Sequence, residues 1–260
     1  MNYIESNTTS NERIIKGIWS VDCLYNPENN GRIFNYKFLV SQTMCGQGCA
    51  YSINSSYDPQ QLLQLLGRDF LKCNITDVAL LISLIDSVYR SRNSAIDCEQ
   101  QYMDATSSEK LRWRTEIIFQ ESQKILGKDP NKKVVNVGVV GDIIKKFIQE
   151  GYTVLGTDFD KNIVGSTLFG RANIYDGTET NKLISEADLA IVTGMTISTQ
   201  TLDGIIETAK THNTKLIIYA ETGANLAPYY LEEGVDCYIS EEFPFYIFNG
   251  NSKIKIYRKK

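Results

Sequence analysis

The residues best placed to do chemistry form a hydroxyl-rich loop, residues 193–201, with the sequence Thr-Gly-Met-Thr-Ile-Ser-Thr-Gln-Thr. Five hydroxyl side chains and a glycine lie here between a predicted strand and a predicted helix. Hydroxyl groups and unpaired N–H groups at a helix N-terminus form a site for an anion such as a carboxylate or a phosphate. Capping the helix needs one hydroxyl, from Thr199 or Thr201, and leaves the others unexplained. We therefore predict that a ligand contacts Gly194, Met195, Thr196, Thr199 and Thr201.

A glycine-containing turn, Gly138-Val139-Val140-Gly141-Asp142, is the second candidate site. Gly138 and Gly141 would let a ligand approach the backbone closely. The turn lacks the G-x-G-x-x-G pattern of dinucleotide-binding proteins, and Asp142 places a negative charge where a phosphate would bind. Asp158 ends the second predicted strand, at a position suited to hydrogen bonds with ribose hydroxyls. The pair Gly138 and Asp158 suits an adenosine cofactor, S-adenosylmethionine or NAD, although Asp142 and Asp158 could equally cap a helix and a loop.

Carboxylates follow two further predicted strands and should gather at the same edge of the sheet. Glu221 and Thr222 follow one strand, and Glu241 and Glu242 follow the next. Such carboxylates could bind a hard cation or transfer protons, or they could be solvated loop charges. We predict that Glu221 and Thr222 contact the ligand and that Glu241 contributes to a metal site.

Two cysteines in the first half of the chain provide further candidate metal ligands. Cys45 and Cys49 flank Gly46 and Gly48, and two thiols at this spacing could bind a soft metal. We expect the two glycines to approach the ligand from this side. His212 is the only histidine, so a His-rich zinc centre and a Ser-His-Asp triad are not expected.

The elements that must position these residues alternate regularly in the second half of the chain. Short apolar strands alternate with helices, which predicts a Rossmann-like parallel sheet with helices on both faces and sites at the carboxyl ends of its strands. The segment 245–257 carries Asn249-Gly250 between apolar runs and predicts an antiparallel edge hairpin, which could pair across a homodimer. The predicted strands span 134–140, 153–157, 188–193, 215–220 and 237–239, and the predicted helices span 142–150, 201–210 and 226–233.

The first half of the chain predicts a smaller α+β domain. Strands are predicted over 12–21 and 32–40 and after the glycines at 46–48, and helices over 59–66, 74–90 and 107–126. Asn74 or Thr76 is expected to cap the second of these helices, and Thr106 and Glu109 have capping-box spacing at the third. The polar turn at 127–132 predicts a boundary between an α+β domain, residues 1–128, and a Rossmann-like domain, residues 129–260.

Composition narrows the class of protein. The chain has 260 residues, a net charge of −4 and 42% hydrophobic residues, as expected for a globular protein of two modest domains. The sequence contains no basic block of the kind that binds nucleic acid or an anionic membrane. It also contains no apolar run long enough to span a membrane. The N-terminus lacks the features of a signal peptide, so we expect a cytoplasmic protein with reduced cysteines.

Seven segments share a pattern with one known family: 12–17, 46–51, 187–196, 201–203, 219–223, 226–228 and 234–236. They resemble the putative heavy-metal chelation domain family. The resemblance implies a Rossmann-like domain preceded by a domain with the fold of the enolase N-terminal domain. It further implies a site between the two domains, with a role in handling a metal or a metal chelate. Ser198-Thr199-Gln200 departs from the family pattern, in which a small residue, Asn and Gly are more usual.

Three functional hypotheses follow. The first is a small-ligand or metal-chelate-binding protein with an interdomain cleft, with or without an enzymatic step in metal or metallophore metabolism. The second is an enzyme that uses an adenosine cofactor, S-adenosylmethionine in a transferase or NAD. The third is a non-catalytic structural or regulatory module.

Overall fold

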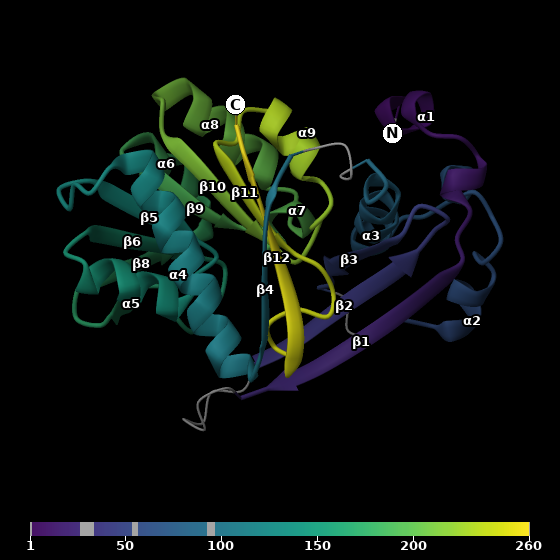
Figure 1. The fold of residues 1–260 in the computed structure, drawn as a ribbon, viewed down its shortest axis with the longest axis horizontal. Coiled ribbons are helices and arrows are strands. Elements are labelled where there is room, and N and C mark those ends of the chain that lie inside the picture. Colours follow the sequence, from purple (N-terminus) through teal and green to yellow (C-terminus); the bar gives the residue numbers. More distant parts are fainter. Residues whose placement is uncertain (1, 27–33, 54–56, 93–96, 260) are drawn as a thin grey trace.

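The computed structural model describes residues 2–26, 34–53, 57–92 and 97–259. Figure 1 shows a small sheet beside a large one, with the small sheet and helix α3 (Val78–Tyr89) formed by the N-terminal part of the chain. The small sheet is antiparallel and has the order β1 (Gly17–Tyr25), β2 (Phe34–Gln42), β3 (Gln47–Tyr51). The first predicted strand therefore begins at Gly17, and Asp77 caps α3 in place of Asn74 or Thr76. Around these elements lie α1 (Asn2–Asn7), η1 (Asn11–Arg13), α2 (Pro59–Leu63) and η2 (Phe70–Lys72).

Six parallel strands form the centre of the large sheet. If these six strands are numbered along the chain, their order across the sheet is 3-2-1-4-5-6. This is the strand order of a Rossmann fold. The predicted fold class is therefore confirmed. From one side to the other the six strands are β8 (Ala172–Asp176), β6 (Thr153–Asp158), β5 (Lys133–Val137), β9 (Leu189–Thr193), β10 (Lys215–Ala220) and β11 (Cys237–Glu241).

Both faces of the parallel strands are buried, because alternate side chains enter two separate cores. Val135 and Val192 pack on one face, with α6 (Thr180–Ser185), α8 (Leu202–His212), α9 (Ala227–Glu232) and the helix α3. Val134 and Ile191 pack on the other face, against α4 (Ser107–Leu126) and α5 (Gly141–Gln149). The core that includes α3 joins the small sheet to the large one.

Antiparallel strands extend the large sheet at both sides. Strand β12 (Gly250–Arg258) lies between β11 and β4 (Glu99–Ala105), and β7 (Thr167–Leu168) pairs with β8. The predicted hairpin is wrong in its pairing, since residues 245–248 form no strand and β12 pairs instead with these two neighbours. Both edges of β12 are occupied, so it offers no free edge to a second copy.

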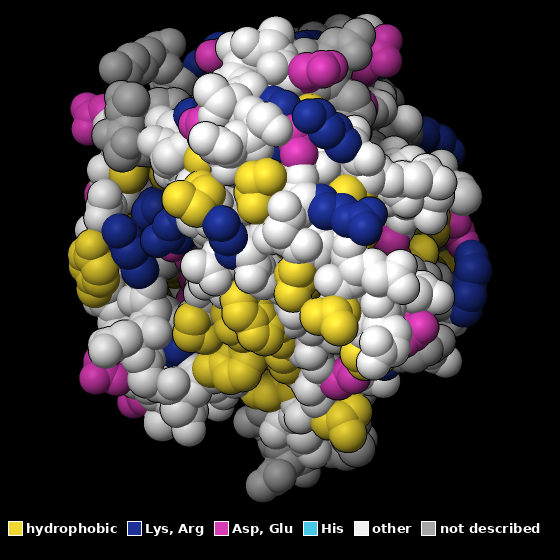
Figure 2. Space-filling view, turned by 90° about the vertical axis from the view of Figure 1, so that its right-hand side faces the viewer, with side chains coloured by type: hydrophobic (Ala, Val, Ile, Leu, Met, Phe, Trp, Pro, Cys, Tyr) yellow, Lys and Arg dark blue, Asp and Glu magenta, His cyan; other side chains and the backbone are white. Residues whose placement is uncertain are grey.

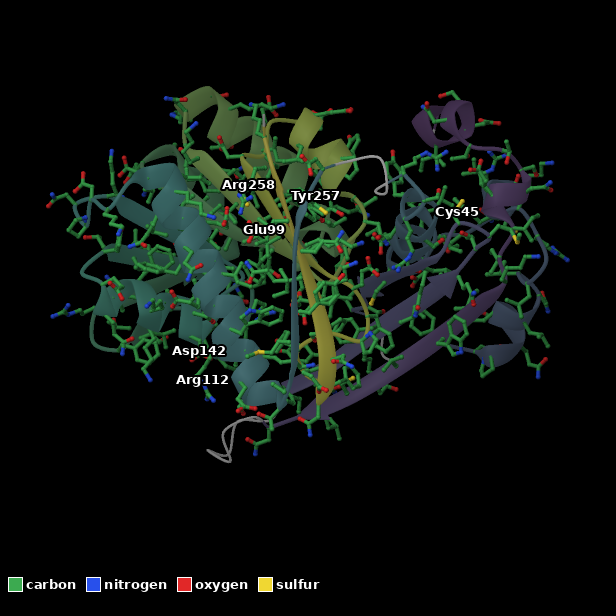
Figure 3. All side chains as sticks on the ribbon, in the orientation of Figure 1. Cys45, Glu99, Arg112, Asp142, Tyr257 and Arg258 are labelled. Atoms are coloured by element: carbon green, nitrogen blue, oxygen red, sulfur yellow. The ribbon has the colours of Figure 1, made fainter. Side chains whose placement is uncertain are left out.

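The elements just before the predicted boundary belong with the large sheet in space. Arg258 of β12 points toward Glu99 of β4 (Figure 3) and donates hydrogen bonds to it and to Glu121 of α4, at 2.6 Å in each case. Helix α4 begins with the predicted capping box, in which Thr106 and Glu109 bond to each other's backbone N–H groups. The division at residue 128 remains a prediction about domains, although β4 and α4 pack on the sheet that follows it.

The end of the molecule that carries α1, α2 and β1 exposes several hydrophobic side chains. Figure 2 shows them gathered among charged residues, and Trp19 of β1 and Leu63 of α2 are among the exposed ones. None of the helices in the described ranges is both long enough and apolar enough to cross a membrane.

Candidate functional site

A cleft of about 790 Å³ opens at the carboxyl ends of the parallel strands. It lies where the strand order reverses, between β5 and β9, which is where open α/β sheets bind their ligands. The small sheet closes the opposite wall with Tyr36, Phe38 and Tyr51. Burial raises the pKa of Tyr51, and so does the charge of Asp158, which also lines the cleft.

The glycine turn reaches the cleft at Gly138, where φ is +73°. A Cβ atom there would lie 2.2 Å from Cγ2 of Thr193, so the turn needs glycine for its own packing. The next two N–H groups already have partners, because Val139 donates to Asp158 at 2.8 Å and Val140 donates to Asn136 at 2.9 Å. These two N–H groups are therefore not free to bind a phosphate.

The helix after this turn starts differently from the prediction. Gly141 is the first residue of α5 and does not line the cleft. Val140 is the N-cap residue and makes no side-chain capping bond, and Asp142 lies in the first turn. Asp142 as N-cap is therefore wrong. Asp158 does line the cleft, and its two carboxylate oxygens accept the N–H groups of Val139 and Asp160.

The hydroxyl-rich loop lies along the cleft, with Met195, Thr196, Thr199 and Thr201 in its lining. It forms the short helix α7 (Met195–Ser198) and then leads into α8. Thr201 is the N-cap residue of α8, one of the two positions predicted, but its hydroxyl makes no capping bond, so the predicted side-chain cap is wrong. The hydroxyls instead donate to carbonyl oxygens: Thr196 to Thr193 at 2.7 Å, and Thr199 to Thr196 at 3.3 Å. A hydroxyl that already donates offers a ligand only its lone pairs.

Two other residues of this loop have structural roles. A Cβ atom on Gly194 would lie 2.7 Å from the carbonyl oxygen of Thr222, so Gly194 lets two loops pack closely without lining the cleft. Gln200 has a φ of +58°, in the left-handed region that favours glycine and asparagine. Gln200 thus has a conformation in which glycine would be less strained, which agrees with the glycine that the resemblance implies at this position.

Arg114 of α4 lies at the base of the cleft and is buried. Its Nη1 donates to Glu221, which also lines the cleft, and its guanidinium lies 3.7 Å from the centroid of the Tyr246 ring. Glu241 lies outside the lining, buried near this cluster, and has no well-formed hydrogen bond among the described residues. Burial raises the pKa of Glu241 to about 7, although the charge of Arg114 opposes this rise.

The loop after β10 links the cleft to the small sheet. Thr222 lines the cleft, and its hydroxyl accepts the N–H group of Tyr51 at 2.9 Å. Ser198 donates to the carbonyl of Tyr51 at 2.8 Å, and Gly223 donates to the carbonyl of Cys49 at 3.1 Å. Strand β3 therefore docks on two loops of the large sheet.

Gly46 and Gly48 do not line the cleft. A Cβ atom on Gly48 would lie 2.2 Å from the carbonyl oxygen of Ser83 and 2.3 Å from the nitrogen of Ser87, both in α3. At Gly46, φ is +151° and a Cβ atom would overlap the side chain of Arg90. Both glycines therefore allow the chain to pass close to α3. The structure does not bring them to the candidate ligand site.

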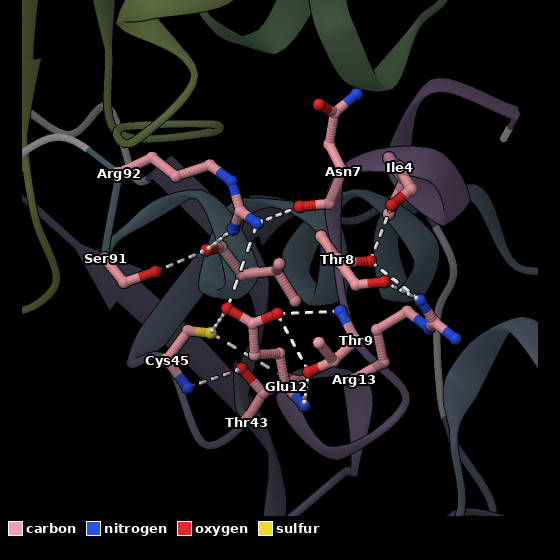
Figure 4. A network of polar contacts seen from close by, with 11 residues as sticks. Ile4, Asn7, Thr8, Thr9, Glu12, Arg13, Thr43, Cys45, Ser91 and Arg92 are labelled. Atoms are coloured by element: carbon pink, nitrogen blue, oxygen red, sulfur yellow. Dashed lines mark hydrogen bonds and ion pairs between the residues drawn. The ribbon is translucent and has the colours of Figure 1, made fainter.

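The structure also does not bring Cys45, Cys49 and Glu241 together. Cys45 lies at the opposite end of the molecule from Asp142 (Figure 3), and its thiol faces the carboxylate of Glu12 (Figure 4) at 3.8 Å. Cys49 is buried, and burial raises the pKa of its thiol, which disfavours the thiolate that binds metal. Across the described ranges, no group of three or more His, Cys, Asp and Glu side chains is arranged to hold a metal ion.

Several residues of the cleft were not singled out in the sequence. The sequence gives one indication that Arg114 is functional. It lies on the same helical face as Ile117 and Ile118, a buried face of α4 on which a charge is unexpected. The sequence around Tyr36 and Phe38 predicts only a half-buried strand. Nothing in that local pattern indicates that these two side chains line the cleft.

Comparison with known proteins supports this architecture. The model of the DUF364 family, described as putative heavy-metal chelation, matches residues 122–222, which confirms the resemblance found in the sequence. A DUF364-family protein of unknown function from Desulfitobacterium hafniense DCB-2 is 14% identical, with a TM-score of 0.59 over 96% of this chain and 95% of that one. Another from Pyrococcus horikoshii is 17% identical, with a TM-score of 0.50 over 92% and 93% of the two chains. At such identities the likeness shows the fold. No curated protein matches the chain.

Proposed function

We propose that this chain, which matches the DUF364 family model over residues 122–222, binds a small organic ligand or a metal chelate in the cleft between the two sheets. The observation that carries the proposal is the cleft itself. Its volume, about 790 Å³, falls within the range of small-molecule sites, and it lies at the point where Rossmann folds bind ligands.

The lining favours a chelate over a bare metal ion. A cleft of this size exceeds the space that one ion and its ligands need, and aromatic rings from Tyr36, Phe38 and Tyr246 form much of its wall. Rings of this kind contact the organic part of a ligand. The protein would then hold the metal through the molecule that coordinates it.

The charge of the lining favours a neutral or cationic ligand. Asp158, Asp160 and Glu221 supply three carboxylates, and Arg114 supplies the one cationic side chain among the described residues of the lining. Arg114 already pairs with Glu221. Because the hydroxyls of Thr196 and Thr199 donate to carbonyl groups, they provide acceptors for a ligand rather than a site for an anion.

A second candidate function is an enzyme with an adenosine cofactor, S-adenosylmethionine or NAD. The observation in its favour is the place of Asp158 at the end of β6, inside the cleft and next to the turn at Gly138. A carboxylate at this position can accept hydrogen bonds from ribose hydroxyls. S-adenosylmethionine also carries a cationic sulfur, which agrees with the charge of the lining.

The test is a binding measurement on variants at Gly204 of α8, which lines the cleft. A Cβ atom on Gly204 would meet nothing closer than the side-chain nitrogen of Asn181 at 3.8 Å, so larger side chains can enter the cleft without a backbone clash. The probes are the nickel complexes of ethylenediamine and of 1,10-phenanthroline, which are both cationic, together with S-adenosylmethionine and NAD, measured by thermal shift and calorimetry. Gly204→Trp should abolish binding of the probe that stabilises the wild type, while Gly204→Ala retains it.

The outcome also separates the functional classes. Stabilisation by chelates alone supports the first proposal. Stabilisation by S-adenosylmethionine or NAD that is lost in Asp158→Ala supports the enzyme. A wild-type protein that responds to no probe, or whose response is the same in Gly204→Trp, contradicts both and favours a structural or regulatory module.

A further inference from the structure

The loops after β6 and β8 hold one aromatic ring in an unusual place. Phe159 follows Asp158 directly and lines the cleft, yet half of its surface, 50%, is exposed. The ring lies on Gly177, because a Cβ atom there would be 2.7 Å from two carbons of the ring and 2.8 Å from a third. Any other side chain at residue 177 would displace the ring. Gly177 therefore acts as a flat support behind Phe159.

The backbone on both sides of this ring is fixed without a ligand. Asp158 and Asp176 are neighbours in the pairing of β6 with β8. The carboxylate of Asp158 accepts the N–H group of Asp160 at 2.9 Å, which closes a turn around Phe159. Asp176 accepts the N–H group of Thr178 at 3.0 Å, which closes a second turn around Gly177.

An ion pair joins the two turns. Lys161 donates to Asp176, so the loop that carries the ring is tied to the loop that supports it. The hydrogen bond from Lys161, with those from Thr178, lowers the pKa of Asp176 to about 2, so this carboxylate is charged throughout the neutral range. The ring is thus preorganised, and an aromatic surface is left open toward the cleft.

From this arrangement we propose that Phe159 on Gly177 is a stacking platform for a planar aromatic ring of the ligand. The inference rests on the proposed function, since it assigns the chemical class of the ligand that the cleft binds. A flat ring that covers Phe159 removes apolar surface of both rings from water and gains the attraction of offset or edge-on aromatic contacts. Two kinds of ligand share this chemistry: a nucleoside, and a chelate whose metal is bound by an aromatic heterocycle.

Phe169 provides a matched control. It is the same residue type and has the same exposure, 51%, but does not line the cleft. Calorimetric titrations use adenosine and the nickel complex of 1,10-phenanthroline as planar probes and the nickel complex of ethylenediamine, which is also cationic, as a probe without an aromatic ring. Phe159→Ala should weaken binding of a planar probe about tenfold or more, as expected for loss of a stacking contact. Phe159→Trp should retain binding, and Phe169→Ala should change the affinity less than twofold.

Gly177→Ala adds a test that keeps the aromatic ring. The added methyl group should displace Phe159 and weaken the same probe, while thermal unfolding shows that the variant is folded. A response to adenosine assigns the platform to a nucleoside, and a response to the phenanthroline complex assigns it to an aromatic chelate.

The platform is contradicted if the wild type binds the nickel complex of ethylenediamine but neither planar probe. It is also contradicted if Gly204→Trp blocks a planar probe while Phe159→Ala binds it with unchanged affinity, and in both cases the proposed function stands. If no probe binds, or Gly204→Trp leaves binding unchanged, the proposed function fails and the platform fails with it.

Discussion

The carboxylate of Asp86, on α3, accepts a hydrogen bond from the backbone nitrogen of Asn225 at 2.7 Å. Its other oxygen accepts the N–H group of Cys49 in β3 at 2.9 Å. One buried side chain thus joins α3, the small sheet and the loop that carries Glu221 and Thr222 into the cleft. The wall of the cleft depends on this contact between segments that lie far apart in the chain.

Replacing Asp86 with alanine should loosen this junction. Two buried N–H groups, those of Cys49 and Asn225, would lose their acceptor, and each loss costs roughly 1–3 kcal/mol in the free energy of unfolding. Asp86→Asn keeps one acceptor and should lose about half as much. Urea unfolding gives the energies, and amide hydrogen exchange at Cys49 and Asn225 locates the effect. Unchanged exchange at both amides in Asp86→Ala would show that the junction does not hold the loop.

The buried ion pair between Arg13, in η1, and Asp69, the N-cap residue of η2, should stabilise the folded chain strongly. Arg13 donates to both oxygens of Asp69, each at 2.9 Å, and to the carbonyl of Thr8 at 2.6 Å. Burial favours a raised pKa for Asp69, but the hydrogen bonds from Arg13 and Ser10 outweigh it and keep the pKa below its ordinary value. Arg13→Met leaves this carboxylate buried without its partner and should cost about 3–5 kcal/mol in the free energy of unfolding.

The control for this variant is an exposed pair of the same chemistry. Lys133 and Glu186 lie 3.0 Å apart near the surface, so Lys133→Met should cost less than about 1 kcal/mol. Urea unfolding of both variants provides the comparison. Equal losses in the two variants would mean that the burial of Arg13 contributes nothing.

Glu241 should make the protein less stable as the pH rises. Its pKa is raised to about 7 by burial, so the folded state prefers the protonated form. The contribution to stability is present below the pKa of the unfolded chain, near 4.5, and is lost as the pH rises through 7. Glu241→Gln removes this loss, so between pH 5 and pH 9 it should gain about 3 kcal/mol relative to the wild type. Asp86, whose pKa burial also raises to about 7, adds the same slope to both proteins and cancels in the difference. A difference that is constant with pH would contradict the prediction.

The sequence predicted five of the six parallel strands, because each of these five is a short apolar run between turn signals and needs no distant partner to be recognised. Helix α4 was predicted with its bounds and cap, since Thr106 and Glu109 lie next to it in the chain. Strand β4 was not predicted. Its residues, Glu-Gln-Gln-Tyr-Met-Asp-Ala, are polar, and their strand conformation comes from pairing with β12, about 150 residues later. Strand β8 was missed because Asn173 and Asp176 interrupt its apolar residues, so that Ala172–Asp176 lacks the continuous apolar run of a buried parallel strand.

For the candidate site, the sequence pointed to the edge of the sheet where the cleft opens, and Gly138, Asp158, Glu221 and part of the 193–201 loop line that cleft. It could not tell which polar groups are already used within the protein. The hydroxyls of Thr196 and Thr199 and the carboxylate of Asp158 all bond to the backbone, and only the folded loops reveal those partners. The opposite wall was missed because Tyr36 and Phe38 reach the cleft through tertiary packing.

Gly48 gives a test of how such glycines should be interpreted. Glycine at this position could let a ligand approach the backbone, as the sequence predicts. It could instead let helix α3 pack closely, as the contacts with Ser83 and Ser87 indicate. If the helix is the reason, Gly48→Ala forces β3 away from α3 and should lower the free energy of unfolding by about 1–3 kcal/mol or more. Gly204→Ala, in an open position of α8, should instead raise it by up to about 1 kcal/mol, because alanine is the better helix former. Urea unfolding compares the two variants. A Gly48→Ala protein that keeps its stability but no longer binds the probe would show that Gly48 belongs to the ligand site.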